Sequence, residues 1–293
     1  MTTYVFASLI DRFVSELKNQ NKSAFTIVAY KKDLEQFVGY LSSKDLNDIR
    51  DVKKEEISGF INKLVSENYS KKSASRKLNS IRTFFRYLKN EKIIDQNPSL
   101  DVAHPKYIQA PPRIFSKLEY RAIRDVAKEN LRTYAMVEIL LQTGIRIGEL
   151  TNIRVGDVKQ EVLYIKPYGK TTFREVPLNT AVKKAVEDYQ KIKTPGEKQE
   201  QGEDERFLFT TRTGKPLLVR NVRQIITRCF REVGIEDATV NDFRNTFIAH
   251  QLMNEYSIDY IAKLVGHKRL SSTERFLNLV GVSTEKKENL EEL

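Results

Sequence analysis

The apolar side chains of the first hundred residues follow a helical repeat. They recur every three or four positions, which is the spacing of one face of an amphipathic helix. The pattern covers residues 6–17, 24–41, 53–68 and 71–89. No alternation of apolar and polar residues typical of a strand stands out in this part of the chain. We therefore predict four helices here.

The fourth of these stretches also carries an ordered set of cations. On a helical wheel its apolar side chains share one half, while Lys72, Arg76 and Arg86 fall on the opposite half and Arg82 lies at its flank. One interpretation is a solvated helix surface. The other is a row of cations that contacts DNA phosphates, as helical arginines and lysines commonly do. The pattern of this helix alone favours neither.

Prolines interrupt the helical pattern after the fourth stretch. Four of them lie within residues 98–112, and proline both breaks helices and stiffens extended segments. A new helix is predicted after Ser116, because Glu119 follows it at the spacing of a capping box. These signals predict a helical domain of residues 1–100, a linker of residues 101–113 and a second domain of residues 114–293.

The second domain combines a short hairpin with further helices. Residues 162–165 and 172–177 read as paired strands, and the polar stretch of residues 192–206 reads as a surface loop with a possible strand at 207–209 after it. Helices are predicted over residues 131–142, 219–233, 241–254, 257–264 and 270–279. The chain is thus predicted to be mainly α, with a small antiparallel β-sheet.

The composition excludes several classes of protein. No apolar run approaches the roughly 20 residues that a helix needs to cross a bilayer, and Asp11 interrupts the first apolar stretch, which argues against a secretory signal. Cys229 is the single cysteine and the three histidines lack metal-ligand spacing, so we expect no disulfide and no metal. The net charge of +11 suggests a polyanionic partner. We expect a cytoplasmic protein.

Four short motifs of the second domain carry candidate chemistry. They are TGIRIGEL at residues 143–150, YGK at 168–170, DFRNTFIAH at 242–250, and LVGH at 264–267 with SSTERF at 271–276. Each arginine, lysine or histidine has an ordinary structural explanation when it is taken alone. Four such motifs in this order are much harder to explain separately.

Together the motifs resemble the tyrosine recombinase (phage integrase) family, in particular its Xer-type members, over nearly the whole chain. The resemblance implies an N-terminal core-binding, SAM-like DNA-binding domain and a mainly helical catalytic domain. It also implies DNA cleavage by a tyrosine hydroxyl through a 3′-phosphotyrosine linkage. That linkage conserves the phosphodiester energy for religation, so no cofactor is implied. A type IB topoisomerase shares this chemistry, but the short helical N-terminal domain favours a recombinase.

The resemblance assigns a role to each residue that matches a family motif. Arg146 and Arg244 match the two arginines that stabilise the negative charge of the pentacoordinate phosphorus. Lys170 matches the lysine that protonates the departing 5′ oxygen. The hairpin turn is one residue shorter than is usual in the family, so Lys166 is kept as a second candidate. His267 matches a residue that hydrogen-bonds the scissile phosphate.

The remaining positions include two departures from the family pattern. Glu149 resembles an acidic residue that supports the first arginine. Asn241 stands where the family commonly has histidine, and asparagine cannot shuttle a proton at neutral pH. Phe276 stands where the family has its nucleophilic tyrosine, and phenylalanine has no hydroxyl.

Two interpretations of Phe276 follow. It is either a Tyr-to-Phe change introduced into an active recombinase or a feature of a natural protein that binds DNA without cutting it. The retained arginines, lysine and histidine favour the first. The leading hypothesis is a site-specific recombinase that is cleavage-deficient as written. The alternative is a non-catalytic, sequence-specific DNA-binding or architectural protein. Both imply double-stranded DNA as partner. The first also implies an inverted-repeat site and a homodimer or homotetramer assembled on it.

Overall fold

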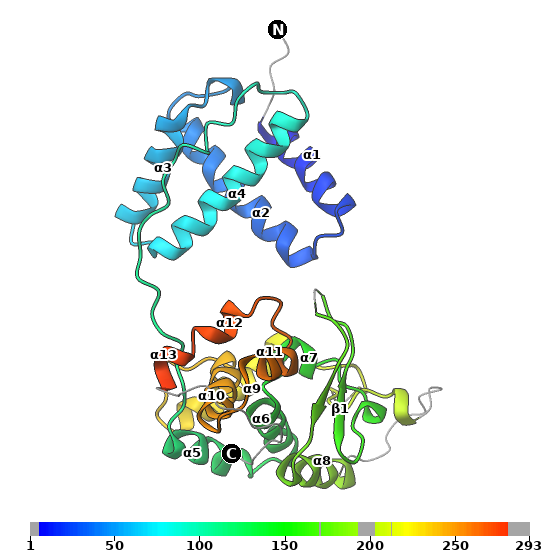
Figure 1. Cartoon of the computed structure of the whole chain (residues 1–293). Coiled ribbons are helices and arrows are strands. Elements are labelled where there is room, and N and C mark those ends of the chain that lie inside the picture. Colours follow the sequence, from blue (N-terminus) through cyan, green and yellow to red (C-terminus); the bar gives the residue numbers. More distant parts are fainter. Residues whose placement is uncertain (1–5, 170, 193–202, 212, 281–293) are drawn as a thin grey trace. The chain divides into compact units, whose positions relative to one another are not determined.

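Two separate units make up the structure (Figure 1). A computed structural model of the chain describes residues 6–169, 171–192, 203–211 and 213–280. The first unit is Met1–Gln109 and the second is Ala110–Leu293, so the division falls inside the segment predicted as the linker. Each unit encloses its own apolar core.

Four helices form the N-terminal unit, as the apolar repeat predicts. They are α1 (Phe6–Asn19), α2 (Ala24–Ser42), α3 (Lys54–Ser66) and α4 (Lys71–Asn90), with one 3-10 turn, Ile49–Asp51, before α3. Serine side chains fix two of the starts: Ser23 Oγ accepts from the Thr26 amide and Ser70 Oγ from the Ser73 amide. Such caps satisfy amide groups that have no partner within the helix.

The first part of the predicted linker contacts the N-terminal unit. Val102 is buried in the apolar core of that unit, and Arg82 on α4 donates to the Val102 carbonyl at 2.6 Å. The His104 imidazole lies between Ser75 Oγ, at 2.8 Å, and Arg82 Nη1, at 2.7 Å. Residues 101–104 are therefore held on α4.

The described residues of the second unit are mainly helical and include one hairpin. Its helices are α5 (Lys117–Ala127), α6 (Leu131–Thr143), α7 (Ile147–Leu150), α8 (Thr180–Ile192), α9 (Val219–Glu232), α10 (Asn241–Met253), α11 (Ile258–Val265), α12 (Ser271–Glu274) and α13 (Leu277–Val280), with 3-10 turns at Val155–Asp157 and Glu203–Glu205. The predicted capping box is present: Ser116 Oγ accepts from the Glu119 amide, and Glu119 accepts from the Ser116 amide. No helix among the described residues is long and apolar enough to cross a membrane.

The hairpin consists of β1 (Val162–Ile165) and β2 (Arg174–Pro177), paired antiparallel with Val162 opposite Pro177. Both strands were predicted from the sequence, whereas helix α8, which packs on α6, was not. Its apolar side chains at helical spacing were the available signal. The possible strand at residues 207–209 is wrong, because Phe207 makes only an isolated bridge to Arg154.

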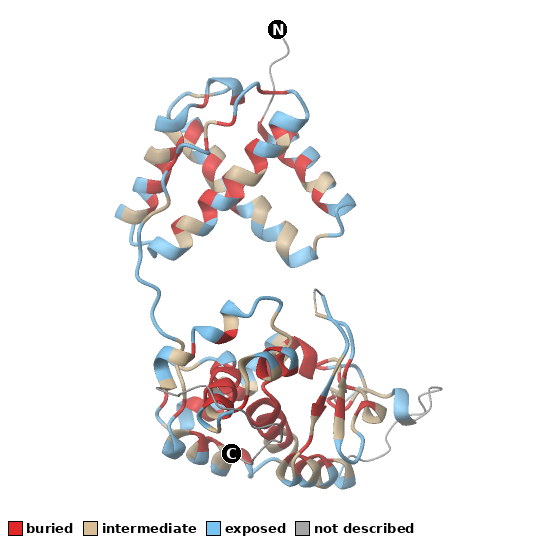
Figure 2. Ribbon diagram, viewed as in Figure 1, coloured by how far each residue is buried: buried red, intermediate tan, exposed pale blue. Residues whose placement is uncertain are grey.

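Helices α6 and α10 are the most completely buried elements of this unit, as Figure 2 shows. Helix α10 contacts α6, α11 and α13. A helix enclosed in this way holds its side chains firmly, because close-packed interiors leave little room for movement. The single helix predicted over residues 270–279 is wrong: Arg275 and Phe276 interrupt it and leave the two short helices α12 and α13.

Candidate active site

Arg146 is placed by a backbone turn at the end of α6. Gly144 ends that helix with φ of +59°, a left-handed conformation that favours glycine. The chain then enters α7 with Arg146 at the N-cap, and the Arg146 amide donates to Glu149 Oε2 at 2.8 Å. The Arg146 side chain keeps 35% of its surface exposed. Its guanidinium can therefore reach a ligand.

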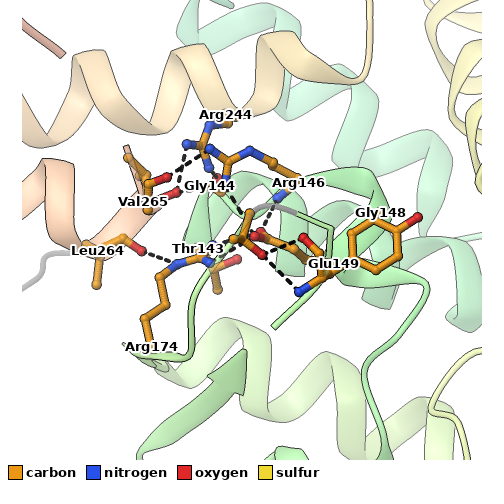
Figure 3. Close-up of polar contacts among 12 residues, drawn as sticks. Thr143, Gly144, Arg146, Gly148, Glu149, Arg174, Arg244, Leu264 and Val265 are labelled. Atoms are coloured by element: carbon orange, nitrogen blue, oxygen red, sulfur yellow. Dashed lines mark hydrogen bonds and ion pairs between the residues drawn. The ribbon is translucent and has the colours of Figure 1, made fainter. Parts of the chain in front are cut away.

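Arg244 approaches the same place from α10. Its Nη1 donates to the Gly144 carbonyl at 2.6 Å and its Nη2 to the Val265 carbonyl at 2.7 Å, and Arg146 Nη1 donates to the same Val265 carbonyl at 3.3 Å (Figure 3). Burial, and then the charge of Arg146, lower the pKa of Arg244 to about 9. Arg244 is therefore still a cation at neutral pH. Two guanidiniums held together in this way suit a phosphate group.

His267 follows the C-terminal end of α11, where Gly266 caps the helix at φ of +67°. Its Nδ1 lies 2.8 Å from Thr273 Oγ1. Burial, and then the charges of Arg244 and Arg146, lower the pKa of His267 to about 3. The imidazole is therefore neutral at pH 7. When the Thr273 hydroxyl donates to Nδ1, the ring proton is on Nε2, which can then donate to a phosphate oxygen.

Glu149 is fully buried between Arg146 and Arg174. Arg174, in β2, donates to both carboxylate oxygens, at 2.9 and 2.7 Å, and Arg146 Nη1 lies 3.3 Å from Oε1 (Figure 3). Burial opposes ionisation of Glu149, but the hydrogen bonds from Arg174 and from the Arg146 amide outweigh it and lower the pKa of the carboxyl. Glu149 is thus a carboxylate that fixes Arg146 by both backbone and side chain.

Arg174 is a residue of the site that the sequence motifs did not predict. Its position contained a signal, because Arg174 lies two residues before Val176, and alternate residues of a strand share one face. Val176 is buried, so an arginine on that face needs a buried acceptor. Glu149 is that acceptor.

Three other predicted site residues have different surroundings. Asn241 is the first residue of α10 and is exposed, and its Nδ2 lies 3.4 Å from Asn245 Oδ1. Lys166 forms an ion pair with Asp157 at 2.8 Å. Lys170 lies outside the described residues.

Phe276 occupies an interior position. Its ring is 0% exposed and belongs to the apolar core of the second unit. The Arg275 guanidinium lies 5.0 Å from the centre of the ring, a cation–π distance. The position expected to hold the nucleophile is thus a packed core position in this conformation.

The cations predicted on α4 fall into two groups. Lys72 and Arg86 are exposed. Arg76 is also exposed, but it donates to both carboxylate oxygens of the buried Asp33, at 2.5 and 2.8 Å, and Arg82 donates to the backbone carbonyls of Ser99, Leu100 and Val102. These structural contacts were not predicted from the helical wheel. DNA binding by the four cations stays a prediction.

The sequence agrees with this geometry when it is compared with known families. The profile of the Phage integrase family matches residues 113–280, and the profile of the phage integrase N-terminal SAM-like domain matches residues 10–92. The chain belongs to the phage integrase family. Members of this tyrosine recombinase family break and rejoin DNA. The family membership predicted from the four motifs is confirmed.

Similar phage integrase family proteins include Xer recombinases. Tyrosine recombinase XerC of Roseiflexus castenholzii is 28% identical over 277 residues, covering 92% of this chain and 88% of that protein. Tyrosine recombinase XerD of Listeria innocua is 28% identical over 279 residues, covering 92% of this chain and 94% of that protein. The similarity thus extends through both domains.

Solved structures show the same phage integrase fold. A lambda integrase dimer bound to a COC′ core site has a TM-score of 0.75 at 19% identity, covering 92% of this chain and 97% of that chain. A tyrosine-to-phenylalanine variant of the Tn1549 transposon integrase, in complex with transposon right end DNA, has a TM-score of 0.76 at 17% identity, covering 93% and 94%. The predicted fold class, a helical SAM-like domain followed by a mainly helical catalytic domain with a small sheet, is confirmed.

Proposed function

We propose that this chain is a site-specific DNA recombinase that recognises its DNA site but does not cut it, because Phe276 replaces the nucleophilic tyrosine. The observation that carries the proposal is the convergence of Arg146 and Arg244 on the Val265 carbonyl. Both arginines come from motifs that match the family, and both are cations at neutral pH. A DNA phosphate is the ligand that such a pair accommodates best.

Each remaining group of the site has a role toward that phosphate. The two guanidiniums neutralise its nonbridging oxygens, and they stabilise the extra negative charge of a pentacoordinate phosphorus. Neutral His267 donates a hydrogen bond from Nε2. Lys170 supplies the proton that a departing 5′ oxygen needs. Glu149 holds Arg146 in place, and Asn241 occupies the place of the usual histidine without its proton-transfer ability.

The missing step is the attack on phosphorus. In an active member the tyrosine hydroxyl forms the 3′-phosphotyrosine bond and a 5′-hydroxyl leaves. Phe276 has no oxygen to form that bond. The buried ring also implies that residues 271–280 must move before any side chain at position 276 reaches DNA. Support for DNA binding by this chain comes from the Tn1549 integrase complex, in which a tyrosine-to-phenylalanine variant is bound to transposon right end DNA.

The proposed partner is double-stranded DNA carrying an inverted-repeat recombination site, in the cytoplasm. Residues 1–100 serve as the core-binding domain, residues 101–113 as the linker and residues 114–293 as the catalytic domain. Exposed Lys72 and Arg86 contact DNA phosphates, and the chain assembles as a homodimer or homotetramer on the DNA. Support comes from lambda integrase structures, which include a dimer bound to a core site and a tetramer bound to a Holliday junction.

A second candidate function is a natural DNA-binding or architectural protein that uses the recombinase fold without cleavage. The complete burial of Phe276 favours it, because a core position has a structural reason to hold phenylalanine. The two candidates differ in one outcome. A tyrosine at position 276 restores cleavage only if the rest of the site is still competent.

Selection of bound duplexes from a random pool tests the shared part of the proposal. The unmodified chain should enrich an inverted repeat with a central spacer. A chain with both Arg146→Ala and Arg244→Ala should enrich the same bases with weaker binding, because phosphate contacts position a protein without reading sequence. Failure of the unmodified chain to enrich any sequence would contradict site-specific binding.

A further inference from the structure

We infer that Arg174 is a positioning residue, which sets the orientation of Arg146 through Glu149 and ties the first arginine motif to the segment before His267. The inference rests on the proposed function, because its effect is read at the bound DNA phosphate. Arg174 lies in β2, outside the four motifs that assign the family. It nevertheless contacts both the first arginine motif, at Glu149, and the end of α11, at Leu264.

The three nitrogen atoms of the Arg174 guanidinium are all engaged. Nη1 and Nη2 form a two-pronged contact with Glu149, at 2.9 and 2.7 Å, and Nε donates to the Leu264 carbonyl at 2.7 Å. The guanidinium also lies against Gly266, where an added Cβ would be 3.2 Å from Nη1. Arg174 thus contacts the carboxylate that fixes Arg146 and the helix end that precedes His267.

Arg174 is not placed to contact DNA directly, because its Nε, Nη1 and Nη2 all donate to protein acceptors, whereas the contacts of the equally buried Arg244 among the described residues use Nη1 and Nη2. The Arg174 side chain is 8% exposed, against 35% for Arg146. The donors that face Glu149 and Leu264 are also unavailable to a phosphate in this geometry. Arg174 therefore acts on the phosphate through Arg146, whose guanidinium shares the Glu149 carboxylate.

Lysine cannot reproduce this arrangement. Its ammonium is a point charge, whereas a guanidinium matches both oxygens of a carboxylate in one plane and still presents Nε to a third acceptor. Arg174→Lys keeps the positive charge near Glu149 but loses the planar contact. It should leave the Glu149 carboxylate held only by its contacts with Arg146, so that both side chains are less well oriented, with little change in net charge.

The test measures how much one DNA phosphate contributes to binding by the chain as it stands, with Phe276. The probe is a duplex half-site taken from the oligonucleotides that the unmodified chain selects, with a neutral methylphosphonate placed at each backbone position in turn. At the phosphate bound by the arginine pair, replacement by methylphosphonate should weaken DNA binding about tenfold or more. This penalty corresponds to the loss of a hydrogen bond between charged groups. In Arg174→Lys that penalty should fall below about threefold at the same position, because a displaced guanidinium loses most of its hydrogen-bond energy.

Three variants separate positioning from a general structural effect. Arg154→Lys is the matched control, because Arg154 pairs with Glu205 elsewhere in the same unit, and it should keep the full penalty. Glu149→Gln, which preserves shape, should reduce the penalty as Arg174→Lys does and covers the case in which Arg174→Lys does not fold. In an Arg146→Lys chain, Arg174→Lys should produce no further reduction.

The outcomes distinguish the inference from the function on which it rests. A full penalty in Arg174→Lys, with the penalty present in the unmodified chain, overturns the role of Arg174 and leaves the proposed function standing. A further reduction in the Arg146→Lys chain overturns action through Arg146. If no position shows a penalty in the unmodified chain, phosphate binding at the arginine pair is wrong, and the inference fails with it.

Discussion

Arg146 and Arg244 share one acceptor, because both donate to the carbonyl oxygen of Val265, at 3.3 and 2.7 Å. Two like charges repel each other at such short range unless other groups compensate. Here the compensation comes from the carbonyls at the C-terminal end of α11, the negative end of the helix dipole, and from buried Glu149. The folded chain thus holds two guanidinium charges close together, and a bound phosphate can neutralise them.

Substitution of Gly144 should cost more stability than its backbone conformation alone explains. A Cβ at Gly144 would lie 2.4 Å from Cδ1 of Phe247, in addition to the strain of φ at +59°. We expect Gly144→Ala to lower the free energy of unfolding by about 3 kcal/mol, the sum of left-handed strain and overpacking. Urea denaturation measures this loss.

Gly234 provides the matched control for that substitution. Its φ is +73°, but nothing lies within 4 Å of an added Cβ. Gly234→Ala should therefore cost only the strain, about 1 kcal/mol. Equal losses in the two variants would contradict the close packing of Phe247 against Gly144.

His267 should make folding stability depend on pH in a defined range. Its pKa is about 3 in the folded chain, against an ordinary value of 6.5. Between these values the unfolded chain binds a proton that the folded chain does not, so the free energy of unfolding falls as pH drops from 6.5 towards 3. Above pH 6.5 the imidazole is neutral in both the folded and the unfolded chain, so His267 no longer lowers the free energy of unfolding.

Chemical denaturation of the unmodified chain and His267→Gln across this range isolates the effect. Carboxyl groups that also titrate are common to both chains, so the difference between the two curves reports the imidazole. The unmodified chain should lose more stability than His267→Gln on acidification. Parallel curves would show that His267 is not held in its neutral form.

The sequence predicted most of this architecture because local signals agreed with the final packing. The apolar repeat defined α1 to α4 to within a few residues, and the predicted helix ends at residues 142 and 264 lie one residue from the ends of α6 and α11, which Gly144 and Gly266 cap. The spaced motifs contain Arg146, Arg244 and His267, so these three residues could be predicted from the sequence. These are features that one segment of chain encodes by itself.

Contacts between distant segments were not predictable in the same way. Arg174 meets Glu149, Leu264 and Gly266 only after the hairpin and α11 have packed together. Arg76 faces solvent, as the helical wheel predicts, with 54% of its side chain exposed, but it also pairs with Asp33 from α2. A helical wheel gives the face of a residue, and it does not show which buried carboxylate a neighbouring helix presents.

Arg76 and Arg86 should therefore respond differently to replacement by alanine. Arg86 is exposed, so Arg86→Ala should reduce the salt dependence of DNA binding, with a slope change of about 0.9 per lost phosphate contact, and leave stability nearly unchanged. Arg76 pairs with buried Asp33, so Arg76→Ala should lower the free energy of unfolding by about 1 kcal/mol.

Binding isotherms at several salt concentrations and thermal unfolding of both variants measure these effects. Lys72→Ala is the companion variant for the exposed group and should behave as Arg86→Ala does. Unchanged slopes in Lys72→Ala and Arg86→Ala would mean that this surface of α4 does not contact DNA.

The C-terminal segment should connect subunits on DNA. Val280 packs against the core of the second unit, and the charged residues 281–293 follow it outside the described part of the chain. We predict that the free chain is mostly monomeric and that DNA brings subunits close enough for this segment to dock in trans. Deleting residues from Val280 onward should leave affinity for a single half-site nearly intact and abolish cooperative occupancy of a full site in a mobility-shift titration. Cooperative filling by the truncated chain would exclude the segment as the connector.

Covalent trapping of DNA by a Phe276→Tyr chain bears on the whole proposal. The substrate is the selected site with a nick beside the cleavage position, so that the short fragment carrying the 5′-hydroxyl diffuses away and religation fails. The restored chain should form a protein–DNA adduct that survives denaturing electrophoresis, and the unmodified chain and a Phe276→Tyr chain with Arg244→Ala should not. Specific binding without any adduct in the restored chain would contradict a cleavage-competent site and identify a DNA-binding protein instead.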